Sequence, residues 1–243
     1  MNGILLIDKP TGLSSFDILK QIRKKLDVRK VGFLGTLDPL ATGLLVFFVG
    51  GATKLIKYFE ETEKVYEVEM EIGKVSDTYD RTGEISATSA GTRQGTSLRE
   101  TYESFLGQQW QITPAFSAVK FQGKRAYEHA REGKIIDLGK RQVSIHEIEI
   151  LSENNPIYSL RVRCSSGTYI RSLVHEMGEM METGAIMNEL RRTHVGLFSV
   201  DEAVQVKNLK TTDLRDLAAD IIEKIDWKRF AESDKRQLLK TFG

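Results

Sequence analysis

The sequence predicts an α+β fold in which a mixed, largely antiparallel central sheet is flanked by helices. Residues 66–72 alternate apolar and acidic side chains, and residues 143–151 and 158–164 alternate in a similar way, as half-buried strands do. Residues 44–49 form a continuous apolar run, which is typical of a strand buried on both faces. Other segments place apolar residues at helical spacing after capping signals, which predicts amphipathic helices beside the sheet.

Length and composition suit one large or two small globular domains, because 40% of the 243 residues are hydrophobic and 28% are charged. The apolar runs are shorter than the ~20 residues of a membrane span, and the first residues lack the charged segment of a secretion signal. We therefore expect a cytoplasmic protein. The single Cys164 excludes an internal disulfide and a cysteine-rich zinc site, and the histidines are scattered, so no metal or other cofactor is expected.

The net charge of +1 conceals an uneven distribution of charge along the chain. Residues 1–30 hold seven Lys and Arg against three Asp, and residues 120–141 hold seven against three acids. Residues 60–84, in contrast, hold nine acids against three bases. This pattern indicates a polarised surface, although charged runs taken alone are most often solvated faces.

The N-terminal segment predicts a short buried strand at residues 4–7 and a turn at residues 8–12, where a proline and a glycine end the strand. Ser14 and Asp17 have the spacing of a capping box, and an apolar stripe predicts the helix that follows them. The stripe consists of Phe16, Leu19, Ile22 and Leu26, and the polar side carries Lys20, Arg23, Lys24 and Lys25.

Later helices follow the same signals. Residues 53–60 and 97–106 predict short helices, the second begun by a capping box of Ser97 and Glu100 and ended by Gly107.

Asp38 lies in a small, stiff loop within residues 31–45. Three glycines permit backbone conformations closed to other residues, Pro39 restricts the bond after Asp38, and small neighbours let a ligand approach the carboxylate. An ordinary interpretation is available, because Asp-Pro commonly initiates a turn in which the aspartate caps its own backbone. Local chemistry alone favours that ordinary interpretation.

The nine residues Gly-Thr-Leu-Asp-Pro-Leu-Ala-Thr-Gly at positions 35–43 resemble the catalytic motif of the tRNA pseudouridine synthase B family, which isomerises uridine 55 in the T-arm of tRNA. The resemblance implies the pseudouridine synthase fold, with Asp38 as the catalytic nucleophile. Residues 8–15 are similar to the family's N-terminal Asp-Lys-Pro-x-Gly-x-Ser-Ser motif. This implies that Lys9 and Pro10 support the catalytic loop, and Lys9 is also a candidate substrate contact.

Two further matches supply candidate residues near the target base. Tyr66 stands in the family's Lys-x-Tyr context, which implies a contact with the base, although core packing would also explain a tyrosine on a buried face. Asp80 lies in a segment that resembles the family's Asp-x-x-Asp-x-x-Gly turn, so it contacts RNA or shapes the turn.

The Gly-Thr-Tyr-Ile-Arg sequence at residues 167–171 opens a predicted helix and resembles a family motif whose arginine pairs with the catalytic aspartate. The resemblance therefore implies that Arg171 pairs with Asp38 and that Tyr169 belongs to the substrate site. An arginine near a helix start is poorly placed against the macrodipole, which weakly favours a specific partner. Leu190 belongs to a Leu-Arg-Arg-x-x-Val-Gly element whose leucine packs close to the target base in the family.

Residues 108–140 resemble an insertion with which the family clamps the T-loop, with Thr113 in place of the family's first proline. Cations interleaved with aromatic rings would neutralise phosphates and stack unpaired bases. A small amphipathic hairpin and helix is the plainer alternative. The cations are Lys120, Lys124, Arg125, Arg131 and Lys134, and the rings are those of Phe116, Phe121 and Tyr127.

The matches run from about Asp8 to Gly196. We therefore expect a catalytic domain at residues 1–196, with the RNA-binding insertion inside it. Residues 197–243 are expected to form a short helical tail, patterned by Leu214, Leu217, Ile221 and Ile222, that is too short for a complete RNA-binding (PUA) domain.

One residue departs from the family pattern. Phe33 stands where the family usually has a histidine near the displaced base. The substitution would keep stacking and lose a hydrogen bond, so rate or substrate preference could differ from those of the family. Activity is still expected, because Asp38, Tyr66 and Arg171 are all present.

Pseudouridine formation breaks the C1′–N1 bond of uridine, turns the uracil and joins C1′ to C5. Asp38 would attack either C6 of the base or C1′, and the sequence leaves both open. Pairing with Arg171 would keep Asp38 ionised and aimed, and Tyr66 would stack on the base and could assist removal of the C5 proton. The uridine must first leave its stack, at a cost of a few kcal/mol that the clamp would offset.

Other classes of protein remain open. A non-catalytic tRNA-folding chaperone would keep the basic clamp without needing Asp38. A carboxylate-dependent glycosidase would need two facing acids, but the alternation turns Glu67, Glu69 and Glu71 outward. The nearest enzymatic alternative is a related synthase that acts on another RNA or that needs a guide and partner proteins. We expect instead a monomer that acts on the T-arm of tRNA and does not bind a membrane.

Overall fold

The computed structural model describes residues 1–88, 97–117, 119–134 and 136–215, together with Ile225 and Arg236. The chain divides into two compact units: unit 1 comprises residues 1–62 and 192–243, and unit 2 comprises residues 63–191. Both units combine helices with largely antiparallel strands, which confirms the predicted α+β class.

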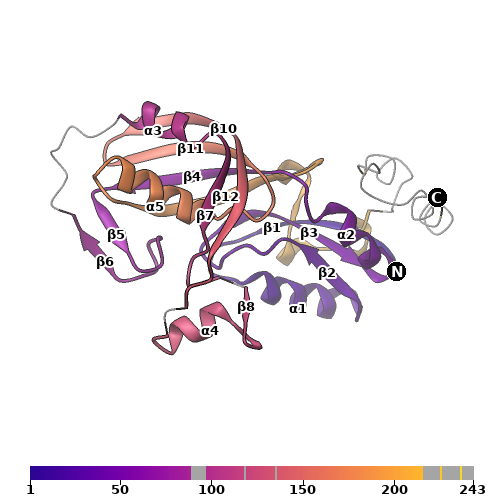
Figure 1. Ribbon diagram of the computed structural model, residues 1–243. Helices are drawn as coiled ribbons and strands as arrows, with labels where there is room; N and C mark the ends of the chain where they lie inside the picture. The colour runs from indigo at the N-terminus through magenta and orange to yellow at the C-terminus, as the bar shows by residue number, and fades with distance from the viewer. Residues whose placement is uncertain (89–96, 118, 135, 216–224, 226–235, 237–243) are drawn as a thin grey trace. The chain divides into compact units, whose positions relative to one another are not determined.

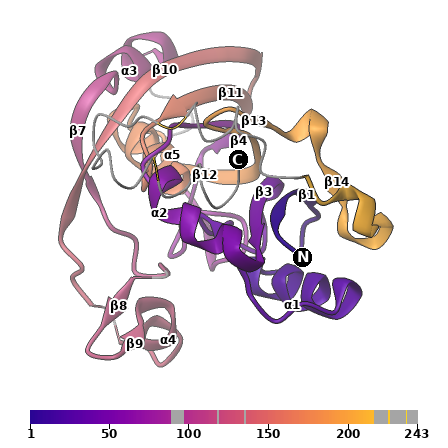
Figure 2. The same ribbon diagram turned by 90° about the vertical axis from the view of Figure 1, so that its right-hand side faces the viewer.

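Unit 1 is built on two long antiparallel strands, β1 (Gly3–Lys9) and β3 (Thr42–Val49), which are buried almost throughout. The apolar runs of the sequence explain this burial, because a strand covered on both faces has no polar side. β2 (Val31–Leu34) pairs with the end of β3. β14 (Val204–Gln205) runs parallel to β1, and Figure 2 shows the two strands side by side.

Helix α1 (Ser15–Leu26) lies beside β2 in unit 1 (Figure 1) and begins at the predicted capping box. The Asp17 amide donates to the Ser14 hydroxyl at 3.1 Å, and the Ser14 amide donates to the Asp17 carboxylate at 3.2 Å. The remaining elements of unit 1 are η1 (Gly50–Leu55), α2 (Ile56–Phe59), β13 (Phe198–Ser199), η2 (Val200–Glu202), η3 (Val206–Asn208) and η4 (Thr211–Asp213).

The prediction that Phe16 belongs to the buried stripe of α1 is wrong, because 53% of this residue is exposed. The buried face consists of Ser15, Ile18, Leu19, Ile22 and Leu26. At about 100° per residue, Phe16 points roughly a quarter turn away from the middle of that face. The sequence places a large apolar side chain at the edge of the helix, where solvent reaches it.

The described residues of the expected tail are 197–215, Ile225 and Arg236, and residues 197–215 form the short strands and 3-10 turns that begin at β13. Leu217, Ile221 and Ile222, whose spacing predicts a helix, lie outside the described residues. The division into a catalytic domain at 1–196 and a tail at 197–243 stays a prediction.

Unit 2 is built on four strands in the order β4 (Lys64–Ile72), β11 (Ile157–Cys164), β10 (Lys140–Asn154) and β7 (Gly107–Ile112), each antiparallel to its neighbour. β12 (Ala185–Val195) lies next to β4 in the strand order and passes into unit 1 at its end. The alternation predicted for β4 is confirmed, because Tyr66, Val68 and Met70 are buried and the glutamates between them are half exposed.

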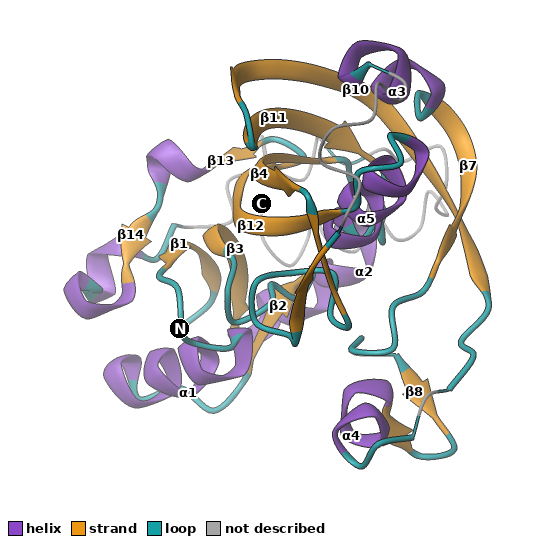
Figure 3. Cartoon of the chain, turned by 90° about the vertical axis from the view of Figure 1, so that its left-hand side faces the viewer, coloured by secondary structure: helices purple, strands orange, loops and turns teal. Residues whose placement is uncertain are grey.

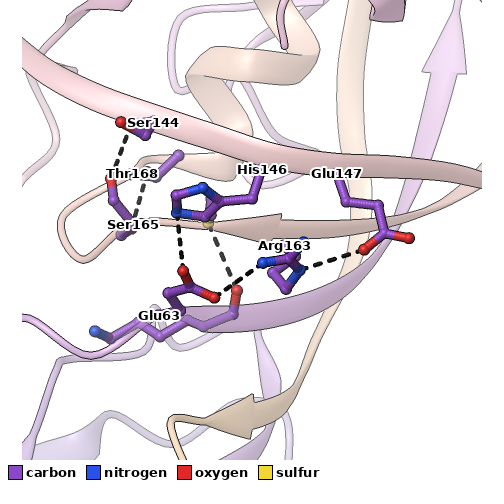
Figure 4. Close-up of polar contacts among 9 residues, drawn as sticks. Glu63, Ser144, His146, Glu147, Arg163, Ser165 and Thr168 are labelled. Atoms are coloured by element: carbon purple, nitrogen blue, oxygen red, sulfur yellow. Dashed lines mark hydrogen bonds and ion pairs between the residues drawn. The ribbon is translucent and has the colours of Figure 1, made fainter. Parts of the chain in front are cut away.

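Glu67 of β4 belongs to a ladder of ion pairs on the exposed face of this sheet. Arg161 on β11 donates to Glu149 on β10 at 2.7 Å and to Glu67 on β4 at 3.1 Å. Each such surface pair contributes little, but pairs across three strands favour one register. Figure 4 shows the same arrangement one step along the strands, where Arg163 contacts Glu147 at 3.2 Å and Glu63 at 3.1 Å.

Residues 107–112, which the sequence assigns to the start of the expected insertion, form the edge strand β7. In this strand Trp110 and Ile112 alternate with glutamines, but both are exposed whereas Gln111 is buried, so the pattern misleads about the buried face. Helix α5 (Ile170–Met180) packs against β4 and β7, as Figure 3 shows. The smaller elements of unit 2 are β5 (Lys74–Ser76), β6 (Ile85–Ala87), α3 (Leu98–Ser104), β8 (Lys120–Phe121), β9 (Lys124–Arg125) and α4 (Ala126–Arg131).

Candidate active site

Asp38 lies in the loop that joins β2 to β3 in unit 1, and the residue is half-buried. The Ala41 amide donates to the Asp38 carbonyl at 3.1 Å, so the Asp-Pro sequence does form a turn. The ordinary interpretation of Asp38 therefore accounts for the shape of the loop. It does not account for the buried side chains that hold the loop in place.

Lys9, at the end of β1, supports the loop from inside unit 1. Its side chain is fully buried, and Nζ donates to the carbonyls of Pro10 at 2.9 Å, Leu13 at 2.7 Å and Pro39 at 3.2 Å. An ammonium has three donors, and these bonds use all of them. Burial lowers the pKa of Lys9 to about 8, although the nearby Asp38 carboxylate opposes the shift. Lys9 is therefore placed to support the loop, with no donor left for substrate.

Arg192 is a second buried cation beneath the loop, and only 1% of it is exposed. Its Nε donates to the Leu44 carbonyl at 2.8 Å, where β3 begins, and Nη2 donates to the Gly35 carbonyl at 3.1 Å, just after β2. One side chain thus joins both ends of the loop. Gly43 permits this close approach, because a Cβ there would lie 2.3 Å from the Arg192 carbonyl oxygen and its φ is +98°.

The N-terminal motif holds the residues on either side of Asp38. The Ser15 hydroxyl accepts from the Leu37 amide at 2.9 Å and donates to the Leu37 carbonyl at 3.1 Å. The Gly12 amide donates to the Pro39 carbonyl at 2.8 Å. The loop therefore receives hydrogen bonds from β1, the following turn, the start of α1 and β12.

We expected no role for Arg192 from the sequence, yet its place on β12 carries a signal of burial. Arg192 and Leu190 are two residues apart on β12, and residues two apart on a strand point to the same face of the sheet. Both therefore point inward. A charged residue at an inward position needs buried partners, which here are carbonyls of the loop.

Arg171 is the second residue of α5 in unit 2, and 5% of it is exposed. Its Nη2 donates to the Phe116 carbonyl at 2.6 Å, and Nη1 lies 3.8 Å from Oδ2 of Asp80. The unfavourable position at a helix start is thus offset within unit 2 by a carboxylate. The expected pairing of Arg171 with Asp38 involves two separate units and stays a prediction.

Asp80 is 3% exposed, and its carboxylate is engaged inside unit 2. Oδ1 accepts from the Thr78 hydroxyl at 2.9 Å and from the Thr82 amide at 2.8 Å, while Oδ2 faces Arg171. Of the two alternatives for Asp80, this geometry favours the one in which it shapes the turn. It also gives Asp80 a second task, because its carboxylate helps to orient Arg171.

We predict that Asp80→Asn reduces kcat by about tenfold and changes KM less, because the amide oxygen can still accept the turn hydrogen bonds while the charge opposite Arg171 is lost. Asp80→Ala removes both and is expected to lower Tm as well. Steady-state rates and thermal melts of the two variants check this. Equal activity in Asp80→Asn and the native protein would contradict a role for this charge.

Tyr169 caps the start of α5, and a buried glutamine holds its main chain. Gln111 on β7 is fully buried, its Nε2 donates to the Tyr169 carbonyl at 3.0 Å, and its Oε1 accepts from the Tyr169 amide at 2.8 Å. The ring lies 6.0 Å from the Arg171 guanidinium carbon, which is within cation–π range. Gln111 is a positioning residue that the sequence did not reveal, since a glutamine beside Trp110 and Ile112 gives no sign that it is the buried residue of the three.

Glu176 lies further along α5, and burial raises its pKa to about 7, although a hydrogen bond from the Ile112 amide opposes this. The folded protein then holds a proton that the unfolded chain releases above its ordinary pKa of 4.5. Stability from this group is complete below pH 4.5 and is lost as the pH rises through about 7. Glu176→Gln is therefore expected to raise Tm at pH 8 and to leave it unchanged near pH 4.5. Melts at both pH values check this, and an equal shift at both would contradict it.

The remaining residues that we expect to contact the target base are apolar or aromatic. Tyr66 on β4 and Leu190 on β12 are 7% and 9% exposed. Phe33 on β2 is half-buried in unit 1. Their roles toward a base stay predictions.

The expected clamp forms a hairpin and a helix that extend beyond the end of β7 (Figure 3). β8 and β9 pair across Gln122 and Gly123, whose φ angles of +48° and +87° suit a two-residue turn of type I′. Lys120 and Lys124 are exposed, whereas Arg125 is half-buried. The hairpin-and-helix alternative is thus correct for the local fold, and it presents two cations to solvent.

The described residues contain no group of three or more His, Cys, Asp or Glu that could hold a metal ion. Burial raises the pKa of the Cys164 thiol to about 11, so this residue is a buried strand residue and a poor nucleophile. None of the helices that the structure describes has the length and hydropathy that a membrane crossing requires.

Solved structures define the class of this fold. Chains in the archaeal box H/ACA sRNP Nop10-Cbf5 complex and in a Cbf5-Nop10-Gar1 complex are each 26% identical to this chain, with TM-scores of 0.61 and 0.64. The matches cover 85% and 96% of this chain, and they span 52% and 58% of those chains. The fold is that of the pseudouridine synthases.

Sequence comparison narrows the class to one family. The model of the TruB family pseudouridylate synthase N-terminal domain matches residues 23–170, and that of the tRNA pseudouridylate synthase B C-terminal domain matches residues 171–224. The tRNA pseudouridine synthase B of Clostridium novyi (strain NT) is 39% identical, over 98% of this chain and 83% of its own. That of Bordetella pertussis (strain Tohama I) is 42% identical, over 86% and 87%. The chain belongs to the TruB family of pseudouridine synthases, which are isomerases.

Proposed function

We propose that this protein isomerises uridine 55 in the T-arm of tRNA to pseudouridine and that the Asp38 carboxylate is the nucleophile. The family's relatives are tRNA pseudouridine synthases, which supports the substrate class. The observation that carries the proposal is the support of the Asp38 loop by two buried cations and the start of α1. A turn that only connected two strands would not need these buried charges.

The proposed reaction breaks and forms bonds at one nucleotide only. Asp38 adds to C6 of the uracil or to C1′ of the ribose, and the C1′–N1 bond breaks. The uracil turns while it stays bound, C1′ joins C5, and the carboxylate leaves. The C5 proton is lost and N1 gains a proton, so the product is an isomer of the substrate.

A fixed loop favours this reaction because the carboxylate must meet a base that has left its stack. Removing the base from the stack costs a few kcal/mol, and contacts with the rest of the RNA must offset this. A nucleophile that is already held in place adds no further ordering cost at that moment. The hydrogen bonds of Lys9, Ser15 and Arg192 supply that order before substrate arrives.

The other candidates take roles around Asp38 in this proposal. Arg171 pairs with the Asp38 carboxylate and keeps it ionised. Tyr66 stacks on the turned base and assists loss of the C5 proton, and Phe33 and Leu190 pack against it. Lys120, Lys124 and Arg125 of the clamp neutralise phosphates, with Tyr169 beside the substrate. We infer that one copy of the chain does this in the cytoplasm.

The test measures tritium release from unmodified tRNA and from a T-arm stem-loop, both labelled at uridine C5. We expect stoichiometric release at position 55. The matched control is the same RNA with cytidine at position 55 and label elsewhere, from which no tritium should be released. If the protein bound the unmodified tRNA and the stem-loop without releasing tritium from either, the result would support the chaperone alternative and contradict the proposal.

A further inference from the structure

Three phenylalanine rings form a row from the interior of unit 1 to its surface. Phe47 on β3 is fully buried and lies opposite Phe33 on β2, with ring centroids 5.6 Å apart. Phe16 on α1 meets Phe33 at 5.3 Å, with an angle of 82° between the rings. Because 53% of Phe16 is exposed, much of its ring remains open to solvent at the outer end of the row.

Two rings of this row belong to segments that adjoin or support the Asp38 loop. Phe33 lies on β2, which leads into the loop. Phe16 directly follows Ser15, whose hydroxyl bonds both main-chain groups of Leu37 next to Asp38. Phe16 therefore directly follows a residue that holds the neighbour of Asp38, the residue that we propose to attack the target nucleotide.

Exposed cations continue from Phe16 along the same side of α1. Lys20, four residues on, has a side chain that is 74% exposed, and Arg23 and Lys24 are also exposed. Residues four and seven positions after Phe16 lie above it on one side of a helix, with a rise of about 1.5 Å per residue. Asp17, the acid in this part of α1, is engaged by the Ser14 cap and Lys20.

We infer that Phe16 stacks on an unpaired base of the RNA strand that carries the target uridine and that Lys20, Arg23 and Lys24 neutralise phosphates of that strand. An aromatic face followed by cations is the usual arrangement for binding single-stranded nucleic acid, because every base has a face to stack and every linkage a charge. A protein partner would need an acidic patch beside an apolar one to use both features, whereas any single RNA strand supplies both along its length. The inference rests on the proposed function, which supplies the RNA.

The first experiment measures Kd for a labelled T-arm stem-loop, by fluorescence anisotropy, with three substitutions at one position. Phe16→Ala is expected to weaken binding by about tenfold, since base stacking has roughly that value. Phe16→Trp keeps an aromatic face and should bind like the native protein, whereas Phe16→Leu keeps only apolar bulk and should resemble Phe16→Ala. Thermal melts confirm that the variants fold.

The second experiment measures the salt dependence of the same binding. Arg23→Gln with Lys24→Gln should reduce the slope of log K against log salt by about 1 to 2, because each lost phosphate contact removes roughly 0.7 to 0.9. The matched control replaces two exposed lysines on other elements of unit 1, Lys54→Gln with Lys57→Gln, and should keep the native slope.

The outcomes separate this inference from the proposed function. Native isomerisation with an unchanged Kd in Phe16→Ala, or equal binding by Phe16→Leu and Phe16→Trp, would overturn the stacking role and leave the function intact. Binding that depends on Phe16 without any tritium release from the native protein would support the stacking role and defeat the proposed reaction.

Discussion

Asp38→Asn is expected to reduce tritium release from T-arm RNA by on the order of 10⁴-fold or more. The amide keeps the shape of the side chain and loses the negative charge that attacks the nucleotide. RNA affinity should change little, because main-chain groups of the loop make the hydrogen bonds with Lys9, Ser15 and Arg192, and these remain in the variant. Rates at saturating RNA and a separate measurement of Kd distinguish the two effects.

Asp27→Asn provides a matched control on the same unit. Asp27 caps the end of α1 with a φ of +49°, a conformation that asparagine also adopts, so the same chemical change should be harmless there. If Asp38→Asn retained rates near those of the native protein, Asp38 would be only the turn residue that the local sequence suggests.

Arg192→Met is expected to reduce kcat by about 10²-fold, because the two ends of the Asp38 loop lose their common donor and small displacements of a reacting group have effects of that size. The carbonyls of Gly35 and Leu44 would be left without the Arg192 bonds inside unit 1. Leu44 is buried whereas Gly35 is exposed, and an unsatisfied buried acceptor costs about 1–3 kcal/mol, so the loss at Leu44 should lower Tm as well. Rates are compared at a temperature where melts show both proteins to be folded.

A second variant, Arg192→Lys, separates the effect of the positive charge from that of the hydrogen-bond geometry. Lysine keeps the positive charge but has no planar set of donors that reaches both Leu44 and Gly35, so kcat should recover only in part. RNA affinity should stay near that of the native protein in both variants, since Arg192 is buried. Native kcat in the folded Arg192→Met protein would show that the loop does not need this support.

Local pattern predicted most of the fold. The alternation of β4, the buried run of β3 and the capping boxes at Ser14 and Ser97 all stand as the sequence predicts. Each of these depends on residues close together in the chain, so spacing is sufficient to reveal it. The edge strand β7 was not predicted, because which of its side chains are buried depends on strand β10, with which it pairs.

The supports of the candidate site could be predicted only in part, for a physical reason. Lys9 was expected to support the loop because it lies in a recognisable motif. Arg192 joins carbonyls that are 148 and 157 residues away, and no local spacing reports such a contact. The exposure of Phe16 depends on where the buried face of α1 is centred, and the apolar character of the residue alone does not give that.

The most direct test of the central claim identifies the product. Unmodified tRNA is incubated with the native protein, and its nucleosides are mapped by position after nuclease digestion. We predict that uridine 55 becomes pseudouridine, an isomer of equal mass with a C1′–C5 bond, and that Asp38→Ala leaves it as uridine. Unchanged uridine 55 with the native protein, pseudouridine only at another position, or release of free uracil would contradict the account.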